Sequence, residues 1–154
     1  MDLPPDFSDL LAEFAADSVE LVIVGGYAVA FHARPRATKD IDILLRGTAS
    51  NLERAARALA RFGAPANVVD AVKALGESDV VYLGQPPLRI DILRRIDGVD
   101  DSVFERALAT MWNGTPVSVI GLDDLIANKR AAARPQDLVD AELLERVRAG
   151  ADVT

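Results

Sequence analysis

The 154-residue sequence contains no cysteine and only one histidine, and each shortage excludes a class of site. Without cysteine the chain can form neither a disulfide framework nor a thiolate zinc site, which fits a reducing compartment. The single histidine, His32, cannot supply the several imidazole ligands of a histidine metal site. Any chemistry in this chain therefore depends on other polar side chains.

Long apolar runs and an excess of basic residues are also missing. The apolar run LVIV (21–24) is far shorter than the ~20 residues of a membrane span, and the acidic start MDLPPDFSDLL lacks a signal-peptide pattern. We therefore expect a cytoplasmic protein without a membrane partner. The 17 basic and 24 acidic residues give a net charge of −7, which argues against generic duplex binding. The net charge does not exclude a local basic patch, which Arg34, Arg36 and Lys39 could form.

Half of the residues are hydrophobic, and the length suits one domain, residues 1–154, with a buried core. Some strands follow one another without room for a crossover helix, so we predict an α/β (α+β) fold with a mixed sheet. Helices flank this sheet, and two of them close the C-terminus. Strands are predicted over 19–24, 40–45, 79–84, 88–93 and 115–120. Helical patterns follow Pro4-Pro5 and cover 27–33, 49–63, 66–75, 102–110, 121–133 and 135–150.

The predicted strand DIDILL (40–45) contains two aspartates on one face. Asp40 and Asp42 alternate with Ile41 and Ile43, so the acidic and apolar side chains point to opposite sides. The two acidic Cα atoms should lie roughly 6.5–7 Å apart. Like charges this close to a core are costly unless a cation offsets them. Mg²⁺ is a usual solution, since it takes one or two carboxylates together with substrate phosphates.

The same apolar-Asp-apolar pattern recurs at Asp91, within the predicted strand LRIDIL (88–93). If this strand neighbours the first, Asp91 joins Asp40 and Asp42 in one cluster. Three such carboxylates are what a two-metal phosphoryl-transfer site requires. In the alternative interpretation, each aspartate is solvated or paired with an arginine such as Arg36, Arg89 or Arg94.

A glycine pair, Gly25-Gly26, separates a predicted strand from a predicted helix. Such a turn exposes backbone N–H groups at a helix N-terminus, where phosphate binds readily. The stretch GGYAVA lacks the third glycine of a dinucleotide fingerprint, and the chain contains no GxxxxGK[ST] motif. The glycine pair therefore indicates neither a Rossmann nor a P-loop site.

The order of these motifs resembles the nucleotidyltransferase superfamily, whose members include DNA polymerase β. Gly25-Gly26 is followed after thirteen residues by Asp40-Ile41-Asp42, and Asp91 lies on a later strand. More narrowly, VGGYAVAFHARPRATKDIDILL looks like small prokaryotic nucleotidyltransferases of toxin–antitoxin systems, the AbiEii and MenA-type toxins. The segment LDDLIANKRAAARPQDLVDAELL resembles the closing helices of that group, so the resemblance spans about residues 19–147.

This resemblance implies a role for each motif residue. Gly25 and Gly26 would hold a nucleoside triphosphate. Asp40 and Asp42 would bind Mg²⁺ or Mn²⁺. Asp91 would complete the metal site and could act as the base on the attacking hydroxyl.

Further residues could have a functional role, and each of them also has a purely structural explanation. By resemblance Lys129 would reach the phosphates, yet it also fits a solvated lysine on a helix surface. Asp137 would be a polar partner in the closing helix, or simply an acid that complements the helix dipole. Thr38 could bind a phosphate or merely lead into the strand. Tyr27 follows the glycine pair where many polymerase-like members have a small hydroxyl residue, so the phosphate contacts stay open.

The expected activity is metal-dependent transfer of a nucleoside monophosphate from a nucleoside triphosphate to a hydroxyl. The resemblance suggests a tRNA or other RNA end, or a protein, as the acceptor, and a cognate antitoxin or toxin as partner. An alternative is a catalytically weak binding module, which a large exposed apolar patch on 49–63 or on the last helix would favour. A third is a domain whose aspartates are structural and do not converge.

Overall fold

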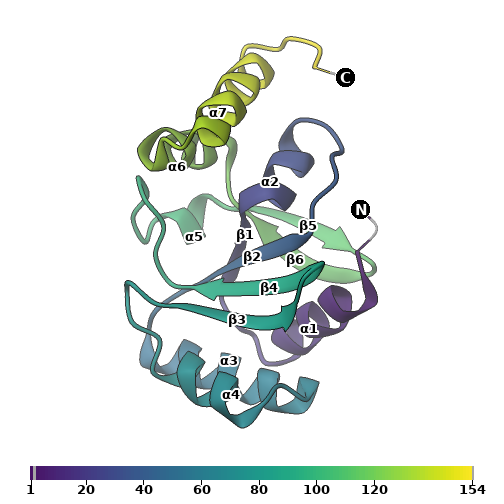
Figure 1. The fold of residues 1–154 in the computed structure, drawn as a ribbon, viewed down its shortest axis with the longest axis vertical. Helices are drawn as coiled ribbons and strands as arrows, with labels where there is room; N and C mark the ends of the chain where they lie inside the picture. Colours follow the sequence, from purple (N-terminus) through teal and green to yellow (C-terminus); the bar gives the residue numbers. More distant parts are fainter. Residues whose placement is uncertain (2, 154) are drawn as a thin grey trace.

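The computed structural model contains a six-stranded sheet with helices on both faces (Figure 1). It describes residue 1 and residues 3–153, so residues 2 and 154 of the predicted domain lie outside the described residues. The strands lie in the order β3-β4-β2-β1-β6-β5. Their bounds are β1 Leu21–Val24, β2 Asp40–Leu45, β3 Val80–Gln85, β4 Leu88–Leu93, β5 Leu108–Trp112 and β6 Thr115–Val119.

The sheet is mixed, as the short connections predicted. The central pair β1 and β2 is antiparallel, whereas β2 and β4 are parallel and β1 and β6 are parallel. The hairpins β3–β4 and β5–β6 are antiparallel. A parallel neighbour needs a long connection, and two helices and β3 lie between β2 and β4 in the sequence. The two strands that carry the predicted carboxylates are therefore neighbours in the sheet.

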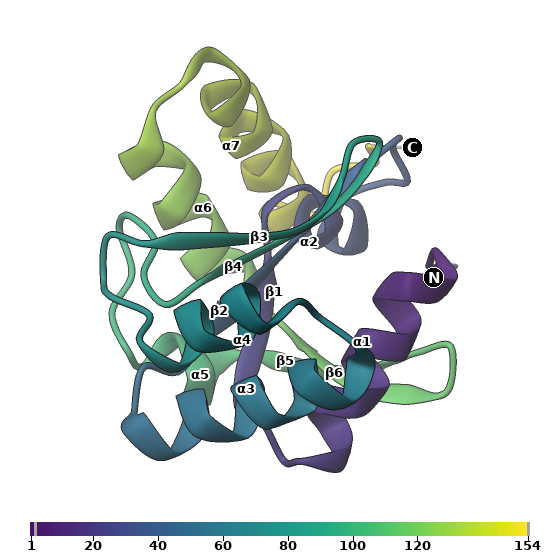
Figure 2. The ribbon, with the colours of Figure 1, turned by 60° about the horizontal axis from the view of Figure 1, so that its bottom comes forward.

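The helices form one layer on each face of the sheet (Figure 2). One layer contains α1 (Pro5–Ala16), α3 (Ala49–Phe62) and α4 (Ala66–Lys73). The other contains α2 (Gly25–His32), α6 (Leu122–Ala132) and α7 (Pro135–Arg148), with α6 packed on α7. Among the described residues, no helix has the length and apolar character that a membrane crossing requires.

Alternation along β2 separates the core from the polar face. Ile41, Ile43 and Leu45 are almost completely buried, on the face opposite Asp40 and Asp42. Burial of each large aliphatic side chain contributes roughly 1.5–3 kcal/mol to folding. The apolar half of β2 therefore stabilises the strand that presents the two aspartates.

The predicted helix over 102–110 is wrong. Only α5 (Val103–Arg106) is helical, and the chain enters β5 at Leu108. Asn113 and Gly114 both have positive φ, 51° and 79°, which suits a tight turn and pairs β5 with β6. Trp112 is buried at the end of β5, with its ring 6.2 Å from that of Tyr27. Sheet pairing and this aromatic contact override the local helical pattern.

Candidate active site

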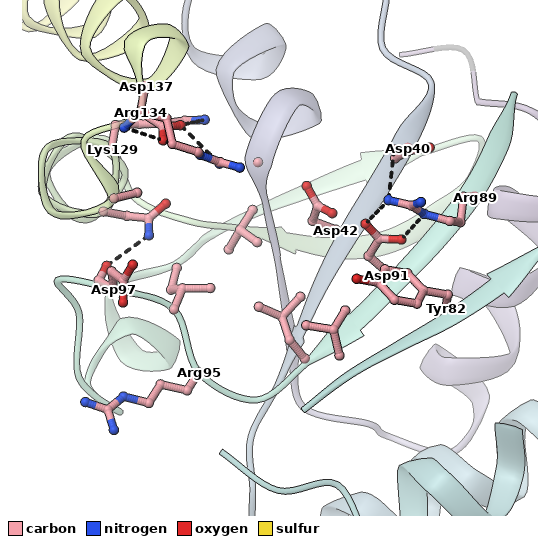
Figure 3. Close-up of a pocket in the computed structure, with 17 residues that line it drawn as sticks. Asp40, Asp42, Tyr82, Arg89, Asp91, Arg95, Asp97, Lys129, Arg134 and Asp137 are labelled. Atoms are coloured by element: carbon pink, nitrogen blue, oxygen red, sulfur yellow. Dashed lines mark hydrogen bonds and ion pairs between the residues drawn. The ribbon is translucent and has the colours of Figure 1, made fainter. Parts of the chain in front are cut away.

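A cavity of about 720 Å³, here called the carboxylate pocket, opens on the face of the sheet that carries α2, α6 and α7 (Figure 3). Strands β2, β3 and β4 supply one part of its wall, and α6 with the start of α7 supplies another. Its charged lining consists of Asp40, Asp42, Arg89, Asp91, Arg95, Asp97, Lys129, Arg134 and Asp137. Together with Gly25, six of the residues for which the sequence predicts a site role therefore share one cavity.

Strand register brings the carboxylates together. In the parallel pairing of β2 with β4, Asp42 lies opposite Asp91 and Asp40 lies opposite Arg89. Neighbouring strands are about 4.8 Å apart, so the Asp42 and Asp91 side chains stand next to each other on one face. The interpretation of scattered, non-convergent aspartates therefore does not fit this geometry.

Arg89 neutralises part of the acidic cluster. Its Nε donates to Asp91 Oδ1 at 2.7 Å, and its Nη2 reaches Asp91 Oδ2 at 3.1 Å and Asp40 Oδ2 at 3.4 Å (Figure 3). The guanidinium also lies 4.5 Å from the centre of the Tyr82 ring. The alternative of aspartate–arginine pairing thus applies to Asp40 and Asp91. Across the described residues, no three acidic or histidine side chains already enclose a possible metal position.

Asp42 is a pocket carboxylate with a raised pKa. Burial first, and then the neighbouring Asp91 and Asp40, together raise its pKa from 3.8 to about 7. Lys129 opposes this shift through its positive charge. Asp42 forms no salt bridge within the described part of the chain. A carboxylate in this environment is one that a cationic ligand would stabilise in its ionised form.

The glycine pair shapes the wall beside Asp42. Gly25 has φ +69°, and a Cβ added there would collide with the Asp42 carboxylate. Helix α2 begins at this residue, and its N-cap, Val24, provides no side-chain cap for the first N–H groups. A Cβ on Gly26 would lie 2.9 Å from Thr38 Cγ2. Gly25 lines the pocket, whereas Gly26 and Thr38 pack against each other beside it.

Thr38 and Tyr27 are placed away from the carboxylates. Thr38 Oγ1 donates to the Arg36 carbonyl oxygen at 3.3 Å. Tyr27 is buried, and its ring lies between those of Phe7 and Trp112, with centroids 6.0 and 6.2 Å away. The tyrosine after the glycine pair therefore belongs to the core and is not part of the carboxylate pocket lining.

Lys129 is buried in an ion network, so the solvated alternative for this residue is wrong. Its Nζ lies 3.3 Å from Asp137 Oδ1 and 3.4 Å from Asp140 Oδ2. Asp137 Oδ2 also accepts from Arg134 Nε at 2.7 Å and from the Arg134 backbone N–H at 3.2 Å. These bonds, Arg134 first, lower the pKa of Asp137. Asp137 thus caps its helix and pairs with Lys129 at once.

Asp140 is the buried acid that sequence reasoning missed. It lies one helical turn after Asp137, on the same face, so its i+3 spacing was the available signal. Its carboxylate accepts from Arg36 Nη1 at 2.7 Å and from Gln136 Nε2 at 2.9 Å. Burial opposes ionisation of Asp140, but the bonds from Arg36 and Gln136 lower its pKa overall. The network therefore connects α7 with the loop that leads into β2.

Comparison with solved structures identifies the fold as that of nucleotidyltransferases. The lincosamide antibiotic adenylyltransferase LnuA, bound to lincomycin, superposes with a TM-score of 0.60 at 15% identity, covering 95% of this chain and 98% of that chain. ANT(2")-Ia in complex with adenylyl-2"-tobramycin gives 0.57 at 15% identity, covering 94% and 93%. At this identity the likeness concerns the fold. A comparison with curated proteins found no match.

The family is established by the sequence itself. Residues 9–154 match the family described as "AbiEii: Nucleotidyl transferase AbiEii toxin, Type IV TA system". The chain belongs to this family and is a nucleotidyltransferase family enzyme. The resemblance found in its glycine, Asp-x-Asp and closing-helix motifs is thereby confirmed.

Proposed function

We propose that the protein transfers a nucleoside monophosphate from a nucleoside triphosphate to an acceptor hydroxyl and releases pyrophosphate. The observation that carries this proposal is the register of β2 with β4, which sets Asp42 beside Asp91 in the carboxylate pocket. The pocket also offers cationic side chains opposite these acids, as triphosphate binding requires. Family membership supports the reaction class.

The donor set fits Mg²⁺ or Mn²⁺. Asp40, Asp42 and Asp91 offer carboxylate oxygens, which these ions prefer, and the pKa of Asp42 is raised by burial and by its acidic neighbours, so a cation beside it would favour its ionised form. These three residues would hold the metal. When bound, it would neutralise charge on the phosphates and lower the barrier to displacement.

The remaining roles fall on groups of this chain. The N-terminus of α2 at Gly25 presents backbone N–H groups beside Asp42, where a phosphate can be held. Lys129 has three N–H donors, and Asp137 and Asp140 occupy two of them, which leaves one for a phosphate oxygen. Asp91, on the strand next to Asp42, would accept the proton of the attacking hydroxyl.

The acceptor we propose is a hydroxyl of a protein or of an RNA end such as that of tRNA. The net charge of −7 disfavours an extended nucleic-acid surface, whereas a single end or side chain needs only local contacts. The family context further suggests a cognate antitoxin as partner. These points favour a small acceptor site over a long groove.

The alternative of a weak binding module receives less support. Within the described residues, α3 contributes none of the large exposed hydrophobic side chains, and α7 contributes only Leu138 and Val139. Two such side chains do not form a large apolar patch. The buried repulsion around Asp42 also has no purpose in a module that only binds a partner.

The test is a labelling experiment. Purified protein is incubated with Mg²⁺ or Mn²⁺ and each labelled nucleoside triphosphate in turn, together with total RNA or cell lysate. The double variant Asp40→Ala/Asp42→Ala removes two proposed metal ligands. Asp70→Asn, at an exposed position on α4, serves as the matched control.

Label in an RNA or protein band that disappears in the double variant and persists in Asp70→Asn is the expected result. The nature of the band names the acceptor class. Absence of label with every nucleotide, together with no metal-dependent nucleotide binding by calorimetry, would overturn the proposed transfer. The protein would then be interpreted as a binding module.

A further inference from the structure

Arg89 stands inside the acidic cluster on which the proposed reaction depends. It precedes Asp91 by two residues on β4, so both side chains lie on the pocket face. It also lies opposite Asp40 in the strand register. The guanidinium is therefore directed by the backbone between two of the three proposed metal ligands.

The contacts of Arg89 are those of a cation that takes up carboxylate oxygens. Both Asp91 oxygens accept from its fork, at 2.7 and 3.1 Å, and one Asp40 oxygen lies 3.4 Å away. Bidentate arginine–carboxylate pairs are the stronger kind of ion pair. Each oxygen that accepts from the guanidinium keeps a second lone pair, so a metal can still approach it, but the guanidinium competes for its negative charge.

The surroundings of Arg89 allow its side chain to move. It is 33% exposed, so it can turn without opening the core. Tyr82, opposite Asp91 on β3, lies under the guanidinium and lines the same pocket (Figure 3). This cation–π contact exists while Arg89 binds Asp91 and does not depend on the carboxylate bonds.

We propose that Arg89 is a positioning residue that acts as an internal counter-cation. It holds Asp91 and Asp40 in the metal-free protein, competes with the divalent ion for their oxygens, and turns away when that ion binds. The inference rests on the proposed function, because it takes the same carboxylates as metal ligands. Metal binding then requires a higher metal concentration, because the ion must first displace the Arg89 guanidinium.

Metal affinity tests this directly, with Mn²⁺ as the probe. Binding to the wild-type chain, Arg89→Gln, Arg89→Lys and Arg95→Gln is measured by calorimetry and by electron paramagnetic resonance of free Mn²⁺. Arg95 also lines the pocket, but its ion pair is with the exposed Glu77, at 3.5 Å. Arg95→Gln therefore removes the same charge from the pocket without freeing a carboxylate of the acidic cluster.

We expect Arg89→Gln to bind Mn²⁺ about fivefold more tightly than wild type, the factor expected when a partly buried ion pair no longer has to be broken. Arg89→Lys, which keeps the charge and loses the fork, should fall between the two. Arg95→Gln should change the affinity by less than about twofold. In EDTA, Arg89→Gln should melt at a lower temperature than wild type, and Mn²⁺ should raise its Tm by more.

A merely structural role predicts a lower Tm with unchanged metal affinity. Metal affinity at or below that of wild type in both Arg89 variants would overturn the inference and leave the proposed function intact. Absence of Mn²⁺ binding in every protein, including wild type, would overturn the metal site and this inference together. If Arg89→Gln does not fold, the affinity of Arg89→Lys decides, because a value at or below wild type contradicts the competition.

Discussion

Asp140 on α7 accepts a 2.7 Å hydrogen bond from Arg36, which lies in the loop that leads into β2. The Asp140 side chain is 2% exposed, and its second oxygen lies 3.4 Å from Lys129. One carboxylate thus connects the closing helix, the buried Lys129 and the entry to the Asp-x-Asp strand. The relative position of these three parts depends on it.

Asp140→Ala should destabilise the protein strongly. Removing one partner from a buried ion network leaves uncompensated charge, which typically costs about 3–5 kcal/mol. The free energy of unfolding, measured by urea denaturation, should fall by that amount. Glu142→Ala, at an exposed position on the same helix, is the control and should change it by less than about 0.5 kcal/mol. Equal stability of the two variants would contradict the structural importance of this network.

Gly25→Ala should impair both folding and activity. The added Cβ meets the Asp42 carboxylate, and φ +69° is unfavourable for alanine. Gly63→Ala separates the two effects, because Gly63 has φ +99° but no atom within 4 Å of an added Cβ. We expect about 1–2 kcal/mol of destabilisation from the backbone in Gly63→Ala, with labelling activity retained. Gly25→Ala should lose more stability and should lose labelling.

Asp42→Asn should stabilise the metal-free protein at alkaline pH. The pKa of Asp42 is raised from 3.8 to about 7 on folding, so ionisation favours the unfolded chain. Stability of the wild type falls as pH rises from about 4 to about 7 and then stays low, whereas asparagine removes this cost.

The advantage of Asp42→Asn should therefore be small at pH 4 and reach about 1–4 kcal/mol at pH 8. Melting in EDTA across this range, with exposed Asp70→Asn as control, measures it. An advantage that is constant from pH 4 to pH 8 would show that Asp42 does not titrate in this interval.

Lys129→Ala should weaken both the fold and nucleotide binding. Asp137 and Asp140 would lose their shared buried cation, at a cost of about 3–5 kcal/mol. The Kd for a labelled nucleoside triphosphate should rise about tenfold or more, since one charged hydrogen bond to phosphate is lost. Lys73→Ala, exposed at the end of α4, provides the matched loss of a lysine and should alter neither quantity.

The sequence predicted the parts of the site that depend on short-range regularity. Alternation along 40–45 and 88–93 identified both Asp strands and the face that each aspartate occupies. The β2–β4 pairing could only be stated as a condition, because register between segments more than forty residues apart arises from tertiary structure. The helix over 102–110 failed for a different reason, because hairpin pairing of 108–112 with the strand that follows outweighs the local helical pattern.

Side-chain partners were harder to predict than strands. Arg89 was one of three arginines proposed to pair with an aspartate. Strand alternation was the available signal, because Arg89 lies two residues from Asp91 on the same face, whereas Arg94 lies three residues away and donates to the Leu75 carbonyl oxygen. Asp140 escaped notice because its importance comes from Arg36 and Lys129, which reach it from two other segments. Burial of a charge is decided by the whole fold, and a local pattern does not report it.

The order of strands gives the pocket a fixed part and a compliant part. Strand β2 is hydrogen-bonded between β1 and β4, so the spacing of Asp42 and Asp91 is held from both sides, whereas β3, with Tyr82, is the edge strand of the sheet. Amide hydrogens of β2 should accordingly exchange with solvent more slowly than those of β3. A ligand of larger bulk in the pocket would then displace the β3 wall, while the distance between Asp42 and Asp91 is conserved.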